Sequence, residues 1–260
     1  MTVDPRTLAR DELDRTATNT GFARAVLAGT APGELWWDRH DDPRAFHALH
    51  PCGMSLLWGP AVADALDAVT AHLLGQAQWL QIDPRWHHLD WDAALGVVAP
   101  AADEPNAVTR HTRVNFSYRP GGDRTERTIP DGWRCRPATA ADFGLTGTVV
   151  PAEYWPDAAS FLAHGGGMVA ERDGEAGAMA FAAFHWGDQV EIGIETVPRF
   201  RRLGLARAAA GALIDALVAD GLRPVWSCRG ANTGSQRLAG SLGFTAPVGT
   251  PYFHLPGRQS

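Results

Sequence analysis

Residues 189–206 hold the side chains best suited to chemistry, in the sequence "QVEIGIETVPRFRRLGLA". A strand that ends in a turn before a helix presents free backbone N–H groups and the positive end of the helix dipole to an anion. Glycine in such a turn permits close backbone approach, and arginine adds positive charge at its rim. We therefore predict a phosphate or pyrophosphate site on Arg201, Arg202, Leu203, Gly204, Leu205 and Ala206.

A solvated arginine turn followed by an ordinary helix is the alternative reading of this stretch. The chain contains no lysine, which excludes a P-loop and a lysine Schiff base. The stretch also lacks the G-x-G-x-x-G dinucleotide fingerprint. The surrounding motifs must therefore decide between an anion-binding site and a solvent-exposed arginine turn.

Two motifs occur in order here. Arg201, Gly204 and Ala206 form the pattern Arg-x-x-Gly-x-Ala, and Asn232 and Ser235 follow the next strand, before a helix that ends in "LGF". Over about residues 132–255 this resembles the GNAT N-acetyltransferase superfamily. The closer wording "EIGIET…RRLGLA…PVWSC" is similar to the subfamily that includes the zwittermicin A resistance acetyltransferase.

The resemblance implies acetyl-CoA, or another acyl-CoA, as co-substrate, held where strand 189–196 splays from strand 223–228. The pantetheine arm would pair with the backbone of Glu195, Thr196 and Val197, and Asn232 and Ser235 would flank it. The cofactor-binding residues implied are Thr196, Val197, Arg201, Arg202, Leu203, Gly204, Leu205, Ala206, Asn232 and Ser235.

Acetyl transfer needs a neutral amine, so a base near the thioester is expected. Period-two alternation puts Glu191, Gly193 and Glu195 on one face of strand 189–196. Glu195 is the predicted catalytic residue because it lies beside the splay, and Glu191 ranks second. The alternative is that one or both are solvent-facing strand residues.

The general acid is not assigned by the sequence. Many members of the superfamily carry a tyrosine at the position that Ala239 occupies here. The candidates elsewhere are Cys228, Tyr154, Tyr252 and a bound water. Cys228 is more readily explained as a buried strand residue, and without an acid an inactive acyl-CoA-binding fold is an open alternative.

The surrounding elements predict an α/β fold: a mixed, mostly antiparallel GNAT-type sheet with helices on both faces. We expect a three-strand antiparallel meander over residues 167–196, a helix at 205–219 ended by Gly221, a strand at 223–228, a helix within 231–244 and a strand at 250–255. A strand at 133–139 precedes them, and Thr139 would cap a helix.

The N-terminal part predicts strands at 33–40, 50–59 and 77–84, helices at 60–75 and 85–95, and a strand at 114–118. This order echoes the second half of the C-terminal part and raises the hypothesis of a degenerate GNAT repeat. The stretches 99–113 and 118–132 are predicted to be linkers. We predict an N-terminal domain at 1–120, a linker at 121–131 and the acetyltransferase domain at 132–260.

Composition limits the partners. Arginine and lysine total 23 against 29 acidic residues, a net charge of −6, which gives no basis for nucleic-acid binding. Cys52, Cys135 and Cys228 are far apart, and no apolar run is long enough for a bilayer, so we expect a cytoplasmic protein without membrane association. No metal site is expected, since the adjacent His87 and His88 would point apart on a helix. Monomer and homodimer are both open.

The leading hypothesis is an enzyme that acetylates a primary amine of a small molecule, such as an amino antibiotic, in self-resistance or biosynthetic tailoring. The N-terminal part would form one wall of the acceptor site. Two other hypotheses are acetylation of a protein or peptide and a non-catalytic acyl-CoA sensor.

Overall fold

The computed structural model describes residues 4–98, 106–121 and 128–257 of the 260-residue chain. The chain forms two compact units and passes from one to the other more than once, so each unit contains segments that are far apart in the sequence. Unit 1 consists of residues 1–115, 229–231 and 249–260, and unit 2 consists of residues 116–228 and 232–248. Each unit is described by itself below.

The sheet of unit 1 begins with an antiparallel meander. Its strands are β1 (Glu34–Trp37), β2 (Phe46–Leu49), β3 (Met54–Trp58), β4 (Ala77–Ile82) and the end of β11 (Phe244–Pro256). Strand β4 pairs parallel with β3, and residues 252–256 of β11 pair antiparallel with β4. The last strand of the chain therefore completes the sheet of unit 1.

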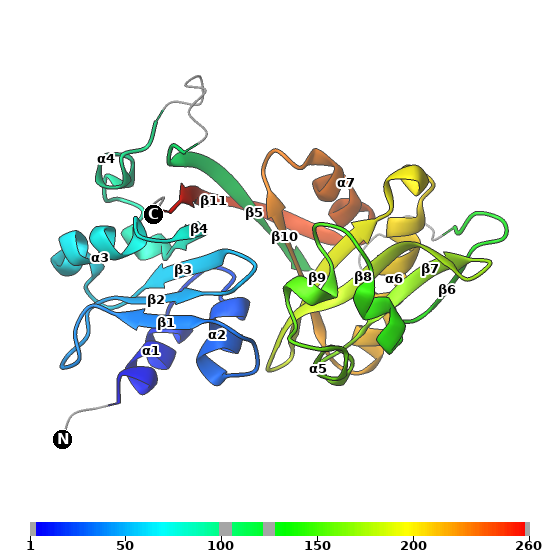
Figure 1. Ribbon diagram of the computed structural model, residues 1–260, viewed down its shortest axis with the longest axis horizontal. Helices are drawn as coiled ribbons and strands as arrows, with labels where there is room; N and C mark the ends of the chain where they lie inside the picture. Colours follow the sequence, from blue (N-terminus) through cyan, green and yellow to red (C-terminus); the bar gives the residue numbers. More distant parts are fainter. Residues whose placement is uncertain (1–3, 99–105, 122–127, 258–260) are drawn as a thin grey trace. The chain divides into compact units, whose positions relative to one another are not determined.

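Helices lie on both faces of the unit 1 sheet (Figure 1). They are α1 (Pro5–Asp14), α2 (Gly21–Ala28), η1 (Val62–Ala65), α3 (Leu66–Leu73), η2 (Pro84–Trp86) and α4 (Trp91–Leu95). Leu57 and Leu80 pack with Val69 of α3 in one buried cluster. On the other face the Trp58 indole donates to the Ala9 carbonyl of α1 over 2.9 Å. Because side chains alternate along β3, Leu57 faces α3 and Trp58 faces α1 on the opposite side of the sheet.

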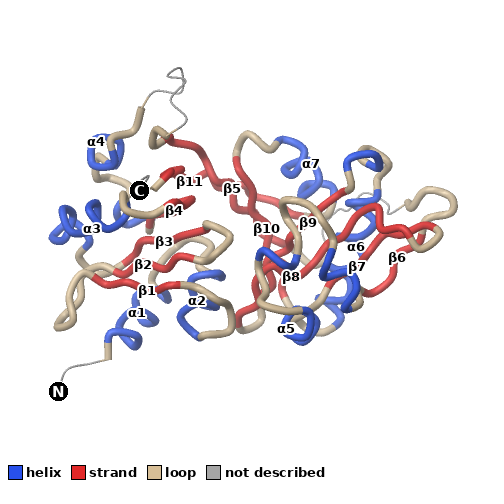
Figure 2. Tube along the Cα trace, viewed as in Figure 1, coloured by secondary structure: helices blue, strands red, loops and turns tan. Residues whose placement is uncertain are grey.

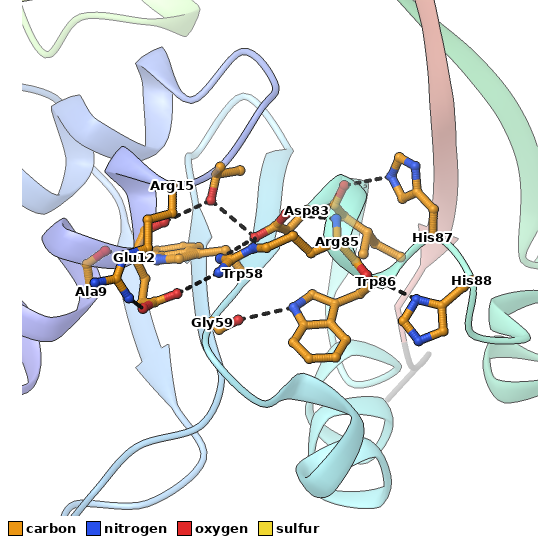
Figure 3. Close-up of polar contacts among 12 residues, drawn as sticks. Ala9, Glu12, Arg15, Trp58, Gly59, Asp83, Arg85, Trp86, His87 and His88 are labelled. Carbon is orange, nitrogen blue, oxygen red and sulfur yellow. Dashed lines mark hydrogen bonds and ion pairs between the residues drawn. The ribbon is translucent and has the colours of Figure 1, made fainter.

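A buried carboxylate anchors α1 to the end of β4 (Figure 3). Asp83 is fully buried and accepts hydrogen bonds from Thr16 Oγ1 (3.1 Å) and Arg85 Nη2 (2.6 Å). Arg85 Nη1 also donates to Glu12 Oε2 over 2.8 Å. Several hydrogen-bond donors offset the cost of burying a carboxylate. This network orders the first helix of the chain.

The sheet of unit 2 is antiparallel through its first four strands. Its strands are β6 (Arg134–Pro137), β7 (Gly167–Arg172), β8 (Glu175–Trp186), β9 (Gln189–Thr196) and β10 (Arg223–Arg229). Strand β10 pairs parallel with β9. Strand β5 (Thr109–Tyr118) contributes residues 116–118 to this unit. Figure 2 distinguishes these strands from the surrounding helices.

The helices of unit 2 cover both faces of its sheet. They are η3 (Ala140–Gly144), η4 (Pro151–Glu153), α5 (Ala158–Ala163), η5 (Pro198–Phe200), α6 (Leu205–Ala219) and α7 (Thr233–Ser241). Alanines on β8 and on α6 lie in one buried cluster, so the helix axis can approach the sheet closely. On the opposite face Phe161 of α5 packs edge-on against Phe181 of β8.

The structure confirms the α/β fold class, the meander at 167–196 and the helix at 205–219. Both units contain a meander, a helix and a parallel strand in the same order, although the duplication stays a hypothesis. No helix of the described residues is long and apolar enough to cross a membrane.

Several local predictions are wrong. The predicted linker at 99–113 contains the start of β5 at Thr109, while its residues 99–105 and residues 122–127 of the second linker lie outside the described parts. The predicted helix at 85–95 is divided into η2 and α4, and Thr139 caps a 3₁₀ turn. Helices α1 and α2 and strand β2 were not predicted. The functional division at 121–131 stays a prediction.

Three polar side chains of unit 1 are connected by a chain of hydrogen bonds in which each donor and acceptor can be assigned. Gln78 Nε2 donates to the Leu73 carbonyl (2.8 Å), so Gln78 Oε1 accepts from His47 Nε2 (2.8 Å). His47 Nδ1 then accepts from His72 Nε2 over 3.1 Å. Burial, with the nearby His72, lowers the pKa of His47 to about 3. The native state thus requires a neutral His47.

The pKa of His47 predicts a loss of stability in acid. An unfolded histidine titrates near pH 6.5, so the unfolded chain binds the extra proton first as the pH falls from 6.5 toward 3. The contribution of His47 is complete above pH 6.5 and decreases by about 1.4 kcal/mol per pH unit below it. We expect His47→Gln, which can still donate to Gln78, to flatten the decline of the unfolding midpoint between pH 7 and 4.5.

The exposed His40 provides the control. His40→Gln should keep the wild-type pH dependence, and an unchanged decline in His47→Gln would contradict the assignment.

Candidate active site

Strands β9 and β10 pair only at their beginnings. The parallel register runs from Arg223 opposite Gln189 to Val225 opposite Glu191, whereas β9 continues to Thr196 and β10 to Arg229. Beyond Glu191 the two strands diverge. The expected splay between strands 189–196 and 223–228 is therefore present.

The turn after β9 exposes a row of backbone amides. Arg202 has φ +65° and Gly204, the N-cap of α6, has φ +83°. Ala208 is the first helical residue whose N–H meets the carbonyl of Gly204, at 3.0 Å, so the amides of the first turn lack an intrahelical acceptor. Left-handed backbone in such a turn directs successive N–H groups to one side, which suits an anion.

A pocket of about 720 Å³ opens between the end of β9, this turn and the start of α7. Among the residues predicted from the sequence, its lining includes Glu195, Thr196, Arg201, Arg202, Leu203, Gly204, Leu205, Ala206, Asn232 and Ser235. Arg207 also lines it and was missed, although it follows the motif by one residue on the first turn of α6. Three arginines against one glutamate make the pocket attractive to a polyanion.

Val197 does not line the pocket. Its N–H donates to the Gly177 carbonyl over 3.0 Å, on the side of β9 that faces β8. The N–H of Thr196 donates to its neighbour Glu195 Oε1 over 3.0 Å. Of the three backbone positions expected to pair with a pantetheine arm, the structure brings Glu195 and Thr196 to the pocket.

Asn232 and Ser235 are fixed by helix α7 and the core beneath it. Asn232 Oδ1 caps the helix by accepting from the Ser235 N–H over 3.0 Å. Ser235 Oγ accepts from the Trp226 indole over 3.1 Å. Both side chains are thus held in place at the wall of the pocket.

One oxygen of the Glu195 carboxylate is held by several hydrogen bonds. Oε2 accepts from the backbone N–H of Thr148 (2.8 Å) and Val149 (3.1 Å), and from the Thr148 hydroxyl (3.3 Å). Oε1 accepts one hydrogen bond from Thr196 N and keeps lone-pair capacity. A Cβ added at Gly147 would lie 2.7 Å from Glu195 Cγ, so any larger residue there would have to displace the Glu195 side chain. The loop at 147–149 therefore fixes the rotamer of Glu195.

The other candidate residues have structural partners. Glu191 is buried and accepts a hydrogen bond from Ser227 where β9 and β10 begin to diverge. Cys228 is buried on β10. Ala239 packs in the core and offers no proton. Among the tyrosines considered, Tyr154 lies edge-on against Phe181 and Phe184, and Tyr252 belongs to unit 1.

His87 and His88 do not share a ligand. His87 Nε2 bonds to the Ile82 carbonyl (2.9 Å) and His88 Nδ1 to the Arg85 carbonyl (3.0 Å), as Figure 3 shows. Within the described ranges no group of three or more histidine, cysteine or acidic side chains is arranged for a metal ion.

Together the splayed strands and the arginine turn form an elongated, positively charged site next to a helix N-terminus. Residues 137–252 match the family model of GNAT acetyltransferases. An uncharacterised N-acetyltransferase of Bacillus subtilis, YdfB, is 24% identical over 228 residues, covering 86% of this chain and 85% of its own length. The family match and this relative support an acetyltransferase enzyme.

Solved structures share the fold over most of the chain. A GCN5-related N-acetyltransferase-like protein from Streptococcus suis aligns with a TM-score of 0.66 at 20% identity, covering 88% of this chain and 90% of its own. A GNAT-family acetyltransferase from Colwellia psychrerythraea aligns with a TM-score of 0.59 at 13% identity over 98% of both chains. The fold of the N-terminal part therefore recurs together with that of the C-terminal part.

The turn at Gly204 predicts a sharp effect of a side chain on CoA binding. Gly204 lines the pocket and an added Cβ there meets no protein atom within 4 Å, so a valine would extend into space that is open to a ligand. We expect Gly204→Val to raise the Kd for CoA at least about tenfold, which corresponds to about 1.4 kcal/mol. Calorimetry measures it.

Gly221 gives a matched control at the other end of α6, because it also has positive φ and open space. Gly221→Val carries a similar backbone strain and should leave the Kd for CoA within about twofold. Equal losses in both variants would refute the pyrophosphate assignment.

Because the loop at 147–149 holds the Glu195 carboxylate, we predict that replacing Gly147 with alanine lowers kcat. Gly147→Ala must displace the carboxylate, whereas Gly144→Ala, three residues earlier, meets nothing within 4 Å. We expect Gly147→Ala to lower kcat about tenfold or more, since misplaced catalytic groups lose rate steeply, with the Kd for CoA unchanged. Identical kcat values for the two variants would show that the loop does not position Glu195.

Proposed function

We propose that this protein transfers the acetyl group of acetyl-CoA to a primary amine of a small molecule, by direct transfer with both substrates bound. The observation that supports this most strongly is the pocket at the divergence of β9 and β10, which opens directly onto the arginine turn. An extended thioester needs such a gap for its arm and an anion site for its pyrophosphate. The turn, free of protein atoms beside Gly204, fits that group.

Each part of the site has a task in this proposal. The first-turn amides of α6, with Arg201 and Arg202, hold the pyrophosphate, and Arg207 adds a further positive charge. Asn232 and Ser235 form the wall beside the arm. The exposed backbone between the diverging strands aligns the thioester with the side chain of Glu195.

We assign Glu195 as the base. Its Oε2 is held by the loop at 147–149, and its Oε1 takes the proton of the incoming amine, directly or through water. The nitrogen of the neutral amine then forms the bond to the thioester carbon, and the carbon–sulfur bond breaks with its electron pair going to sulfur. The remaining excess proton on the nitrogen passes to the departing CoA thiolate, directly or through water. Fixing one oxygen while the other accepts a proton makes this a preorganised base.

The acceptor is proposed to be a small amine, and the similarity in motif wording to the zwittermicin A resistance subfamily supports an amino antibiotic. Self-resistance and biosynthetic tailoring both use such a reaction. We further propose that it acts in the cytoplasm, where its three free cysteines stay reduced.

A non-catalytic acyl-CoA sensor is the second candidate, because Ala239 is buried where many relatives in the superfamily place a proton donor. An assay of CoA release with acetyl-CoA and a panel of small amines and peptides separates these functions. Release that requires a small amine supports the proposal. Release with peptides alone identifies a peptide acetyltransferase, and CoA binding without release with any acceptor identifies a sensor.

The base assignment predicts a defined kinetic defect. Glu195→Gln should lower kcat/KM by about 10²-fold or more, the range of a positioned base. The loss should shrink at high pH, because the amine then deprotonates unaided. Steady-state kinetics between pH 6.5 and 9.5 measure it, and a loss that is constant across this range would contradict a base role.

Direct transfer also predicts that no acetyl group resides on Cys228, which is buried on β10. Incubation with acetyl-CoA alone should give no burst of free CoA and no acetylated Cys228 by mass spectrometry. Acetylation of Cys228 at the rate of turnover would establish a two-step mechanism in place of the proposed one.

A further inference from the structure

A group of aromatic and cationic side chains lies on one face of the unit 1 sheet. We call it the Trp79 cluster; it consists of Trp79, His111, Arg229, Tyr252 and His254. The Trp79 ring stacks with that of Tyr252 at 5.1 Å between centroids. His254 and His111 lie 4.5 Å and 5.1 Å from the same ring.

The strand register explains why these rings share a face. His254 of β11 lies directly opposite Trp79 of β4, and Tyr252 lies opposite Gln81. Directly opposed residues of antiparallel strands point to the same side of the sheet. Phe253 and Leu80 alternate with them and point into the core that contains α3. The Trp79 cluster is thus on the face away from that core.

Arg229 gives the cluster a fixed positive charge. Its guanidinium carbon lies 5.1 Å from the centroid of the Trp79 ring, and its side chain is exposed. In the described parts of the chain Arg229 has no carboxylate partner, unlike Arg85 or Arg136, which are ion-paired. A planar guanidinium above an aromatic ring keeps its donors free for a carboxylate or phosphate.

The two histidines add hydrogen-bonding capacity without adding charge at neutral pH. Burial lowers the pKa of His254, and the charge of Arg229 lowers it further. Burial, His254 and Arg229 lower the pKa of His111 in the same direction. Both rings are therefore flat, neutral surfaces beside a cation.

Gln81 provides a second, independent sign of a ligand. It lies two residues beyond Trp79 on the same face and is 1% exposed. Among the described residues neither its Oε1 nor its Nε2 has a hydrogen-bond partner. An unsatisfied buried amide costs about 1–3 kcal/mol, a penalty that a bound polar group can remove. The chain thus keeps an unfavourable polar side chain next to an aromatic and cationic surface.

We propose that the Trp79 cluster binds a planar anion, an aromatic or heteroaromatic ring that carries a carboxylate or a phosphate. The ring of the ligand packs against the partly exposed side chains of Trp79 and His254, and Arg229 pairs with the anionic group. This site is separate from the arginine turn of unit 2 and does not depend on the acetyltransferase proposal, since none of its residues lines that pocket.

Calorimetry on the full chain tests the site with simple probes. 4-Aminobenzoate and phenyl phosphate combine a ring with an anion, aniline lacks the anion, and cyclohexanecarboxylate lacks the aromatic ring. We expect saturable binding of at least one of the first two, and affinities at least about tenfold lower for both of the others. A preference between the two anions identifies the carboxylate or the phosphate as the recognised group.

Arginine variants locate the bound anion. Arg229→Gln should weaken binding about tenfold or more, and it should fold normally because Arg229 is exposed. Arg223→Gln, at the other end of β10, and Arg201→Gln, in the CoA turn, should leave probe binding unchanged. Trp79→Leu is the second variant and should remove the preference for an aromatic ring, with its fold checked by circular dichroism.

Titrations with and without CoA separate this site from the proposed cofactor site. Probe binding that persists in the presence of CoA and is lost in Arg229→Gln supports the Trp79 cluster, even if CoA itself fails to bind. The proposal is overturned if neither anion binds saturably, if Arg229→Gln binds like wild type, or if Arg201→Gln or CoA abolishes probe binding.

Discussion

The site depends on one constraint, the end of hydrogen bonding between β9 and β10 after Glu191 and Val225. Parallel neighbours normally share a continuous ladder, and an interrupted ladder leaves backbone groups that need another partner. The strands diverge toward the turn that starts α6, so the gap and the exposed helix amides face the same pocket. In the proposed function, a thioester arm takes the place of the lost strand partner and its pyrophosphate binds at the helix, which would couple cofactor binding to the sheet.

The divergence also explains why Glu195 needs outside support. Its strand has lost one neighbour, so the loop at 147–149 supplies backbone N–H groups that hold Oε2. Gly147 permits this approach because any side chain would enter the space of the Glu195 carboxylate. A glycine far away in sequence thereby determines the geometry of the proposed base. Sequence spacing contains no trace of this contact, which forms only when η3 and η4 fold beside β9.

Prediction from sequence succeeded where local chemistry decides the structure. The helix at 205–219 has a strong apolar face and glycine at both ends, and the meander at 167–196 has tight-turn pairs between its strands. Most of the residues predicted after β9 line one pocket, although their role stays a prediction. Prediction failed where tertiary contacts decide. Helix α1 has a polar sequence and is ordered through Asp83, and β5 extends through a stretch whose composition resembles a linker.

The N-terminal unit has a similar connectivity, but its turn is filled differently. Its corresponding turn follows β3 at Gly59, where an added Cβ would lie 2.4 Å from the Arg44 carbonyl. The same carbonyl accepts the N–H of Ala61 (3.1 Å), and the Gly59 carbonyl accepts the Trp86 indole (3.0 Å). Asp64 in the first turn of η1 is ion-paired with Arg44, so its carboxylate already occupies the helix start, where an anion would bind. In unit 1 the backbone around Arg44 therefore fills the space beside Gly59, whereas in unit 2 no protein atom fills the corresponding space beside Gly204. The two units differ in this turn after the meander.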